Sequence, residues 1–238
     1  MNLLAIDAAT EKFSVALAGS GGTTWLFEAD AGLRHSEMLM DCIDTLVRMA
    51  GLGPEDLSGV VCMGGPGSFT GLRIGFSVAK GLALSLGIPC AAVPTLDCMA
   101  RPFHALPGVA VPVLDAKKKA FFCALYRGGE KLCPDMDAEP AQIARALANA
   151  LEPPEQAMLF GPGAQMLYDA LQAANCDITG IKLGKGLRWG NAETLLQIAT
   201  ETQILTHSCI GYASGPEYIR KSDAEMQEKE QRAVSKEQ

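Results

Sequence analysis

The chain has 238 residues, of which 48% are apolar, and a formal net charge of −7. This length allows one or two domains with a sizeable core. The acidic balance excludes a broadly basic surface, so any contact with nucleic acid requires a local basic patch or a partner. Eight cysteines without a Cys-x-x-Cys pair are typical of small buried side chains in a reducing compartment. We therefore expect a cytoplasmic protein without a signal peptide or a membrane span.

Strands and helices alternate along the first half of the chain, which is typical of an α/β fold. Strands are expected at residues 2–6, which lead into Asp7, and at 13–18, 24–27, 59–63 and 89–93. Helices are expected from Ser36, as the N-cap, to about residue 50, and over residues 70–86. The glycine-rich turn at residues 19–22 predicts a hairpin between the second and third strands.

The second half of the chain repeats features of the first half. When Asp115 is placed over Asp7, DAATEKFSVALA and DAKKKAFFCALY agree at five of twelve positions without a gap. A weaker match aligns Gly65-Pro66-Gly67 with Gly161-Pro162-Gly163, each after an apolar run and before a helical segment. This self-similarity predicts a duplicated lobe. We expect an N-terminal lobe over residues 1–103, a C-terminal lobe over 104–215, and a segment over 216–238 that returns toward the first lobe and ends in a polar tail.

The stretch GGPGSFTGLRIGFSVAKGLA, residues 64–83, has the appearance of a phosphate-binding loop but completes no phosphate-binding template. A P-loop requires lysine directly after its last glycine, and Leu72 follows Gly71. The dinucleotide-binding pattern fails at Thr70, where a third glycine is needed.

The same stretch carries small residues at every fourth position. These are Gly67, Gly71, Gly75, Ala79, Ala83 and Gly87. Because glycine inside a helix costs up to about 1 kcal/mol relative to alanine, the pattern indicates that something packs very close to the helix. Two interpretations remain open: tight packing on the protein's own sheet, or contact with a helix of another chain.

Motifs spread along the chain resemble those of the TsaB (YeaZ) family. They are Ile6-Asp7 with Thr10, RHSE at residues 34–37, GPGSFTGLRIG at 65–75, AKGLA at 79–83, LDA at 114–116 and PEYIR at 216–220. The resemblance covers residues 3–220, and the GPGSFTGLRIG run is the most specific part of it. It implies a two-lobed actin-like ATPase (ASKHA) fold with duplicated mixed-sheet lobes.

The resemblance also implies a function without catalysis. TsaB-like proteins support the synthesis of threonylcarbamoyladenosine in tRNA by pairing with a catalytic TsaD-like subunit and a TsaE-like ATPase. Contact with tRNA is then expected mainly through the complex, with no contact with membranes. No intrinsic cofactor is expected, although ATP or ADP at the interface of the complex is compatible with the family, and so is self-association through the partner surface.

The partner contact in the family is built from its first two long helices, here residues 36–50 and 70–86. The resemblance therefore implies these partner-binding residues: Arg34, His35, Ser36, Leu39, Ile43, Gly71, Arg73, Gly75, Ala79 and Ala83. It places Arg220 as an anchor of the returning chain.

The sequence lacks residues that metal binding and phosphoryl transfer require. Catalytic relatives carry His-x-x-x-His where this chain has Thr95 and Met99, so no metal site is expected. Actin-like kinases need glycines after the strand-end aspartates, whereas alanine and lysine follow Asp7 and Asp115. We treat Asp7, Thr10, Gly65 and Gly67 as vestigial nucleotide-binding positions.

Three alternatives remain at this point. The lysines at 117–119 suit either a solvated turn or a contact with tRNA or a phosphate. An ATP-binding small-molecule kinase or ATPase of the actin-like fold is the alternative to the scaffold. A peptidase has little support, because neither a metal cluster nor a nucleophile–base pair is evident.

Overall fold

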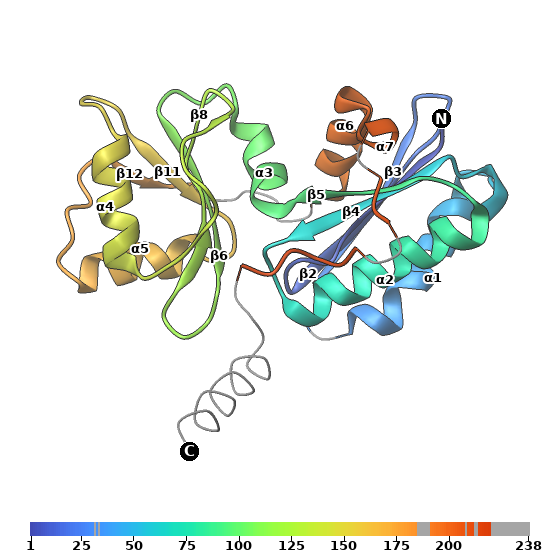
Figure 1. The fold of residues 1–238 in the computed structure, drawn as a ribbon, viewed down its shortest axis with the longest axis horizontal. Helices are drawn as coiled ribbons and strands as arrows, with labels where there is room; N and C mark the ends of the chain where they lie inside the picture. Colours follow the sequence, from blue (N-terminus) through green and yellow to red (C-terminus); the bar gives the residue numbers. More distant parts are fainter. Residues whose placement is uncertain (31, 33, 185–190, 208, 212–213, 220–238) are drawn as a thin grey trace, which may run out of the picture.

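Two lobes, each built on a mixed β-sheet, make up the protein in a computed structural model (Figure 1). It describes residues 1–30, 32, 34–184, 191–207, 209–211 and 214–219. The first sheet has the strand order β3-β2-β1-β4-β5 and the second has the order β10-β7-β6-β11-β12. In each sheet the first three strands of the lobe's core pair antiparallel: β1 with β2 and β2 with β3, and likewise β6 with β7 and β7 with β10. The other two strands then add in parallel on the far side of the first strand, β4 and β5 beside β1, and β11 and β12 beside β6. The two lobes therefore share one topology. The predicted duplication is confirmed.

The N-terminal lobe contains the first five strands and the two long helices. Its strands are β1 (Leu3–Asp7), β2 (Lys12–Ala18), β3 (Thr24–Asp30), β4 (Gly59–Gly65) and β5 (Cys90–Pro94). Its helices are α1 (His35–Met49) and α2 (Phe69–Leu86), with a short 3-10 turn, η1 (Pro54–Asp56), between them. Each of these elements lies within a few residues of its expected position. Helix α1 begins one residue before Ser36, so the prediction of Ser36 as the N-cap is wrong and Arg34 occupies that position.

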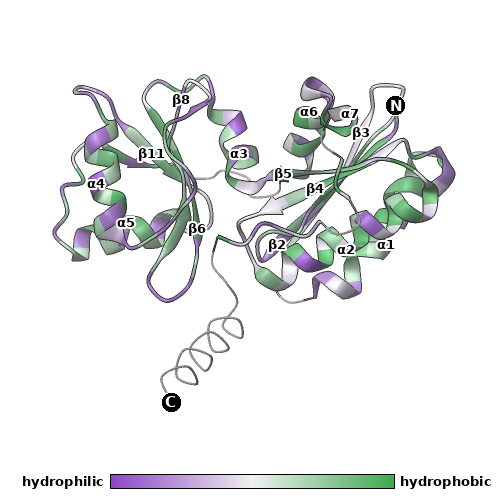
Figure 2. Ribbon diagram, in the orientation of Figure 1, coloured by the Kyte–Doolittle hydropathy of each residue, from purple (hydrophilic) through white to green (hydrophobic). Residues whose placement is uncertain are grey.

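The C-terminal lobe follows a short link made of α3 (Thr95–Ala100) and the 3-10 turn η2 (Arg101–Phe103). Its strands are β6 (Val109–Asp115), β7 (Phe121–Cys123), β8 (Tyr126–Arg127), β9 (Glu130–Lys131), β10 (Met136–Ala138), β11 (Ala157–Phe160) and β12 (Ile181–Leu183). Its helices are α4 (Pro140–Ala150) and α5 (Ala164–Ala173). The helices of both lobes alternate hydrophobic and hydrophilic residues, as expected for elements with one face on a sheet (Figure 2).

The chain returns to the N-terminal lobe after β12. Helix α6 (Ala192–Thr202) packs across β1 and β2, on the face of the sheet opposite α1 and α2, and α7 (Ile204–His207) lies beside β5. This differs from the expected division, which assigned residues 104–215 to the C-terminal lobe. Residues 214–219, here called the strap, then run along α2 (Figure 1). Arg220 and the polar tail lie outside the described residues.

The small residues of α2 pack against the protein's own first hairpin. An added Cβ at Gly67 would lie 2.5 Å from the carbonyl oxygen of Ala9, and one at Gly71 would collide with the carbonyl oxygen of Ala8. At Gly75 the added atom would already lie 3.4 Å from the Cβ of Ala8. The first interpretation of the stripe is therefore correct, because only glycine lets α2 approach the backbone after β1 so closely.

Substitutions on the two sides of α2 should have opposite effects on stability. Gly71→Ala forces the backbone of Ala8 away, so we expect it to lower the free energy of unfolding by about 3 kcal/mol. Gly81 has no atom within 4 Å of an added Cβ, so Gly81→Ala should raise this free energy by up to about 1 kcal/mol. Urea unfolding of both variants measures the difference, and equal stabilities would contradict the close packing described here.

Candidate functional site

A cleft of about 950 Å³ lies between the lobes. The N-terminal lobe contributes the β1–β2 turn, the start of α1 and the start of α2, and the C-terminal lobe contributes the β6–β7 turn and the start of α5. The strap closes one side. Four of the exposed large hydrophobic side chains line this cleft: Phe69, Met166, Tyr218 and Ile219. The cleft is thus partly lined by apolar side chains that come from both lobes and from the strap.

The buried carboxylate of Asp7 holds the N-terminus of α6. Its Oδ2 accepts hydrogen bonds from the backbone N–H of Asn191 at 3.1 Å and from the Asn191 side-chain amide at 2.9 Å. Beside it, the Oγ of Ser14 accepts a hydrogen bond from the N–H of Ala192 at 3.1 Å. Residues of β1 and β2 thus satisfy the free N–H groups that begin α6, where a negative charge is favourable.

Burial raises the pKa of Asp7, while the N–H groups of Ala9 and Asn191 and the nearby His35 partly offset this rise. The carboxylate accepts from Ala9 through Oδ1 and from Asn191 through Oδ2. Both oxygens are therefore committed to internal contacts, which makes Asp7 a structural residue in this arrangement.

The β1–β2 turn is closed by internal hydrogen bonds. The N–H of Ala9 donates to Asp7, and the carbonyl of Ala9 accepts from Ser68 at 2.7 Å. The Oγ1 of Thr10, which lines the cleft, donates to the carbonyl of Lys12 at 2.8 Å. Gly65 has φ +107° and approaches Glu217 of the strap, while Gly67 approaches Ala9. Of the four vestigial nucleotide-binding positions, Thr10 and Gly67 line the cleft, whereas Asp7 is buried and Gly65 packs against the strap.

The start of α1 joins this turn through a buried histidine. The Nε2 of His35 lies 3.1 Å from the carbonyl oxygen of Glu11, and its ring packs against Phe13 with centroids 5.5 Å apart. Arg34 and Ser36, on either side, are exposed. His35 therefore belongs to the core of the lobe, although its edge lines the cleft.

The opposite wall carries the β6–β7 turn with its three lysines. Lys117, Lys118 and Lys119 have φ values of 59°, 53° and 64°, so all three adopt the left-handed conformation. Such a conformation costs a residue with a side chain roughly 1–2 kcal/mol. Asp115 supports the turn by accepting from the backbone and side-chain nitrogens of Lys117 at 2.7 and 2.9 Å, and its charge raises the pKa of Lys117.

The strap is fastened along α2. Arg73 stacks on Phe69 with 3.7 Å to the ring centroid and donates from Nε to the hydroxyl of Tyr218 at 3.0 Å. The Nζ of Lys80 donates to the carbonyl of Ser214 at 2.8 Å, and the N–H of Glu217 donates to the carbonyl of Gly64 at 2.8 Å. The strap thereby becomes part of the N-terminal lobe and of the cleft wall.

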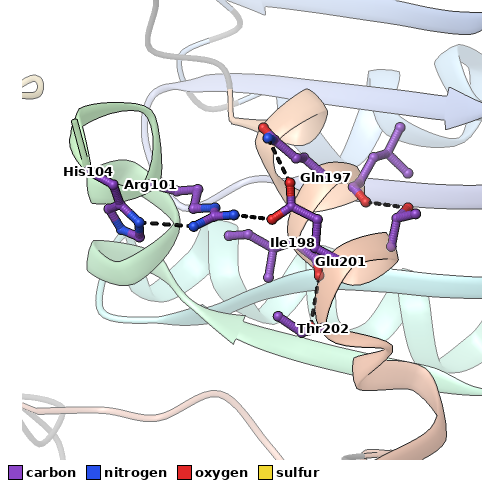
Figure 3. A network of polar contacts seen from close by, with 8 residues as sticks. Arg101, His104, Gln197, Ile198, Glu201 and Thr202 are labelled. Carbon is purple, nitrogen blue, oxygen red and sulfur yellow. Dashed lines mark hydrogen bonds and ion pairs between the residues drawn. The ribbon is translucent and has the colours of Figure 1, made fainter. Parts of the chain in front are cut away.

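A second tie connects the link between the lobes to α6. Arg101 of η2 lies between His104 and Glu201 and bonds to both, and Gln197 donates to the other oxygen of Glu201 at 2.9 Å (Figure 3). The Nδ1 of His104 must accept here, because a guanidinium only donates. Burial and the charge of Arg101 lower the pKa of His104, while Asp97 and Glu201 oppose this effect.

Known proteins with related sequences and structures identify the family. A family model described as "TsaD: tRNA N6-adenosine threonylcarbamoyltransferase" matches residues 29–228. A protein named TsaB from Haemophilus influenzae is 28% identical over 92% of this chain and 94% of its own length. Proteins of the same name from Bacillus subtilis and Escherichia coli are 33% and 34% identical. The chain belongs to this family, in its TsaB (YeaZ) branch.

The extent of these matches differs between relatives. The Bacillus subtilis match covers 58% of this chain and 62% of the relative, and the Escherichia coli match covers 55% and 57%, less than two thirds of either relative. The structure named YeaZ from Pseudomonas aeruginosa superposes with a TM-score of 0.71 at 22% identity, over 92% of this chain and 99% of that one. The two-lobed fold expected for the TsaB (YeaZ) family is thus confirmed.

Most of the residues expected to bind a partner are core residues, and this part of the expectation is wrong. Leu39 and Ile43 of α1 are buried, as are Gly71, Gly75, Ala79 and Ala83 of α2. They lie on the inner sides of the two helices, and His35 is buried as well. Only Arg34, Ser36 and Arg73 of this set are exposed. The four-residue spacing of small residues indicated that some element packs closely on α2, but it did not indicate whether that element belongs to this chain or to a partner.

The positions that carry histidines in catalytic relatives lie on one side of α3. Thr95 and Met99 are both buried, and the hydroxyl of Thr95 has no hydrogen-bond partner. Within the described ranges, no group of three or more His, Cys, Asp or Glu side chains is placed to hold a metal ion. Nor does any helix in the described part of the chain combine the length and apolarity needed to cross a membrane.

Several residues of this region were not anticipated. Asn191 stands directly before the helical pattern of α6, which is an N-cap signal, but its contact with Asp7 spans 184 positions of sequence. Ser14 and the Arg101–Glu201 pair carry no local motif, and Tyr218, although it lies in the PEYIR run of the returning segment, was not singled out. The contacts of Ser14 and Arg101 follow from the return of the chain at α6, which the sequence repeat does not predict.

Removing the Asp7 carboxylate should destabilise the protein. Asp7→Ala leaves the N–H donors of Ala9 and Asn191 buried without an acceptor, so we expect a loss of about 3 kcal/mol in the free energy of unfolding. Ser14→Ala leaves the N–H of Ala192 without its acceptor, so it should lower the free energy of unfolding by about 1 kcal/mol. Urea unfolding measures both variants. Because the folded pKa of Asp7 is raised above 3.8, the stability difference between wild type and Asp7→Ala should shrink as pH rises from 3.8; no change with pH would argue against this.

The His104 contact should make stability depend on pH in the opposite direction. The folded pKa of His104 lies below 6.5, so its contribution is present above pH 6.5 and lost as pH falls toward the folded value. His104→Gln keeps an acceptor for Arg101 without this titration. The stability of wild type relative to His104→Gln, from urea unfolding at several pH values, should therefore decline below pH 6.5, and parallel curves would contradict it.

Proposed function

We propose that the protein is a non-catalytic scaffold in the synthesis of N6-threonylcarbamoyladenosine in tRNA. In this proposal it docks a TsaD-like catalytic subunit through the outer faces of α1 and α2. A TsaE-like ATPase completes the assembly, and ATP or ADP binds at the shared interface. Membership of the TsaB (YeaZ) family supports the pathway, and the surface of the two helices supports the role within it.

Helices α1 and α2 lie side by side on one face of the first sheet, with their outer sides away from the sheet (Figure 1). Three large apolar side chains of these helices are exposed: Met40 at 46% and Met49 at 66%, on opposite flanks of α1, and Leu84 of α2 at 58%. Methionine is enriched at protein–protein interfaces relative to the rest of a protein surface. Leu84, on the outer side of α2, is the exposed apolar residue that carries the docking proposal.

Small residues also occur on the outer side of α2. Ser77, Gly81 and Ser85 are exposed and follow one another at four-residue spacing. Gly81 has open space where a side chain would project. A helix from a partner can therefore approach α2 closely from outside, while the inner small residues serve the protein's own sheet. A second copy of the chain fits the same surface, so self-association is part of the proposal.

The hydrogen bonds made by Asp7 at the end of β1 favour a non-catalytic subunit over a kinase. Both oxygens of Asp7 hold Ala9 and Asn191, so binding a magnesium ion would require breaking contacts that anchor α6. In the β1–β2 turn, the carbonyl groups of Ala8 and Ala9 lie against Gly71 of α2 and against Gly67 just before it. These contacts support a role in which the partner provides the chemistry.

Docking should depend on the outer face of α2. Leu84→Glu places a charge in the proposed contact, so we expect it to weaken binding of the TsaD-like subunit from the same organism by at least about tenfold. Isothermal titration calorimetry of the two purified subunits measures this. Size-exclusion chromatography of wild-type mixtures provides the reference complex.

Ala148→Glu is the matched control, because it adds the same charge to an exposed position of α4 in the other lobe. It should leave binding within about twofold of wild type. Equal affinities for Leu84→Glu and wild type would overturn the proposed docking face. A tRNA modification assay with and without this subunit then tests the role itself, and equal product in both would overturn the scaffold.

A further inference from the structure

We propose that the ion pair between Arg101 and Glu201 is a latch that holds the cleft between the lobes open. The latch, as named here, consists of Arg101, His104, Gln197 and Glu201 (Figure 3). When it is released, the lobes rotate about the link and the cleft narrows. This inference concerns the shape of the isolated chain, so it does not depend on the proposed scaffold function.

The link between the lobes belongs to the C-terminal lobe by its packing. Most of the buried side chains of α3 share a hydrophobic cluster with residues of β6, β7 and β11. The ring of Phe103 in η2 packs on Phe160, with 3.9 Å between the centroids. Asp97 of α3 accepts hydrogen bonds from the hydroxyl of Tyr126 and from the Nζ of Lys131. These contacts make α3 and η2 move with the second sheet.

Helix α6, in contrast, belongs to the N-terminal lobe. Its buried side chains share a cluster with residues of β1, β4 and β5, and Asp7 holds its start. Because Arg101 lies on the link and Glu201 lies on α6, their ion pair joins one lobe to the other. Cys98 of α3 packs in the same cluster as α6, so α3 is where the two lobes meet and can act as the pivot between them.

The latch and the cleft lie on opposite sides of this pivot. Figure 1 shows α6 above β5 and the strap, which borders the cleft, below it. The described residues that line the cleft include no member of the latch. A contact that holds the lobes together on one side of a pivot keeps them apart on the other side. Release of the latch therefore allows the cleft to narrow.

Exposed apolar side chains favour the narrowed cleft. Phe69, Tyr218 and Ile219 are exposed on the side of the N-terminal lobe, and Met166 of α5 is exposed on the side of the C-terminal lobe. Narrowing removes part of this apolar surface from water, which is favourable. The cleft consequently has a reason to close, and the latch is the contact that opposes closure.

The latch is built to form readily and also to be released. The Nη1 of Arg101 lies 2.9 Å from the Nδ1 of His104, and Gln197 donates to Glu201 at 2.9 Å, so both charged groups are oriented before they pair. The side chains of Arg101 and Glu201 remain 34% and 41% exposed, so water and salt weaken their attraction. Such a pair suits a contact that opens and closes.

The test removes the carboxylate of the latch. Glu201→Ala keeps a good helix former at an exposed position of α6, so the fold should persist. A soluble paramagnetic probe relaxes the isotope-labelled methyl groups of exposed methionines in NMR spectra. We expect this enhancement at Met166 to fall by about twofold or more as the cleft narrows, and to stay unchanged at Met49, which is exposed on α1. Residual dipolar couplings should show a changed angle between the lobes.

Glu155→Ala is the matched control, because it breaks an ion pair of similar exposure within one lobe. Arg127 and Glu155 are 34% and 26% exposed, and both belong to the C-terminal lobe. This control should keep the wild-type enhancement at Met166 and the wild-type lobe angle. The exchange variant Arg101→Glu/Glu201→Arg restores the pair with its charges reversed, so it should return both measurements to the wild-type values.

Three outcomes would overturn the proposal. One is a Met166 enhancement in Glu201→Ala that is the same as in wild type or larger. Another is an equal change in Glu155→Ala, which would mean that any lost ion pair loosens the molecule. The last is an exchange variant that behaves like Glu201→Ala, which would assign the effect to the side chain at position 201 alone and not to the pair.

Discussion

The close approach of α2 to the turn after β1 is the constraint on which the rest of the N-terminal lobe depends. Gly67 and Gly71 allow the helix to rest on the carbonyls of Ala9 and Ala8, where any side chain would collide or crowd. This contact fixes the direction of α2. It thereby determines which side of the helix faces the sheet, which side faces solvent, and where its first turn borders the cleft. Helix α2 thus has an inner side that packs on the sheet, an exposed outer side, and a first turn that borders the cleft.

Duplication supplied two equivalent strand-end aspartates, and the two lobes use them differently. Asp7 is fully buried and holds the start of α6, whereas Asp115 is partly exposed and supports the β6–β7 turn. The difference follows from the path of the chain after β12, because α6 returns to cover β1 and β2 of the first lobe. The same backbone position is thus a packing site in one lobe and the base of a surface turn in the other. Shared topology does not imply shared chemistry.

The features predicted from the sequence are those set by local patterns. The twelve-residue match around Asp7 and Asp115 predicted the duplicated lobes, and hydrophobic periodicity placed α1, α2 and the strands of the first sheet. The element that α2 approaches through its small residues could not be predicted, because Gly75 indicates a close neighbour whether that neighbour is Ala8 or another chain. Contacts such as Asp7 with Asn191 depend on tertiary structure alone. The left-handed lysines were equally hidden, since lysine carries no signal for that conformation.

The proposed docking face can be tested apart from the cleft. It belongs to the outer sides of α1 and α2, whose inner sides are fixed by the first sheet. The strap joins α2 to the cleft wall through Tyr218 and Ser214, which bond to Arg73 and Lys80 on the helix. Leu84 lies one turn beyond Lys80 and is exposed, so a charge added there should leave the strap and the cleft wall in place. A loss of binding in that variant would then report on the outer side of α2 alone.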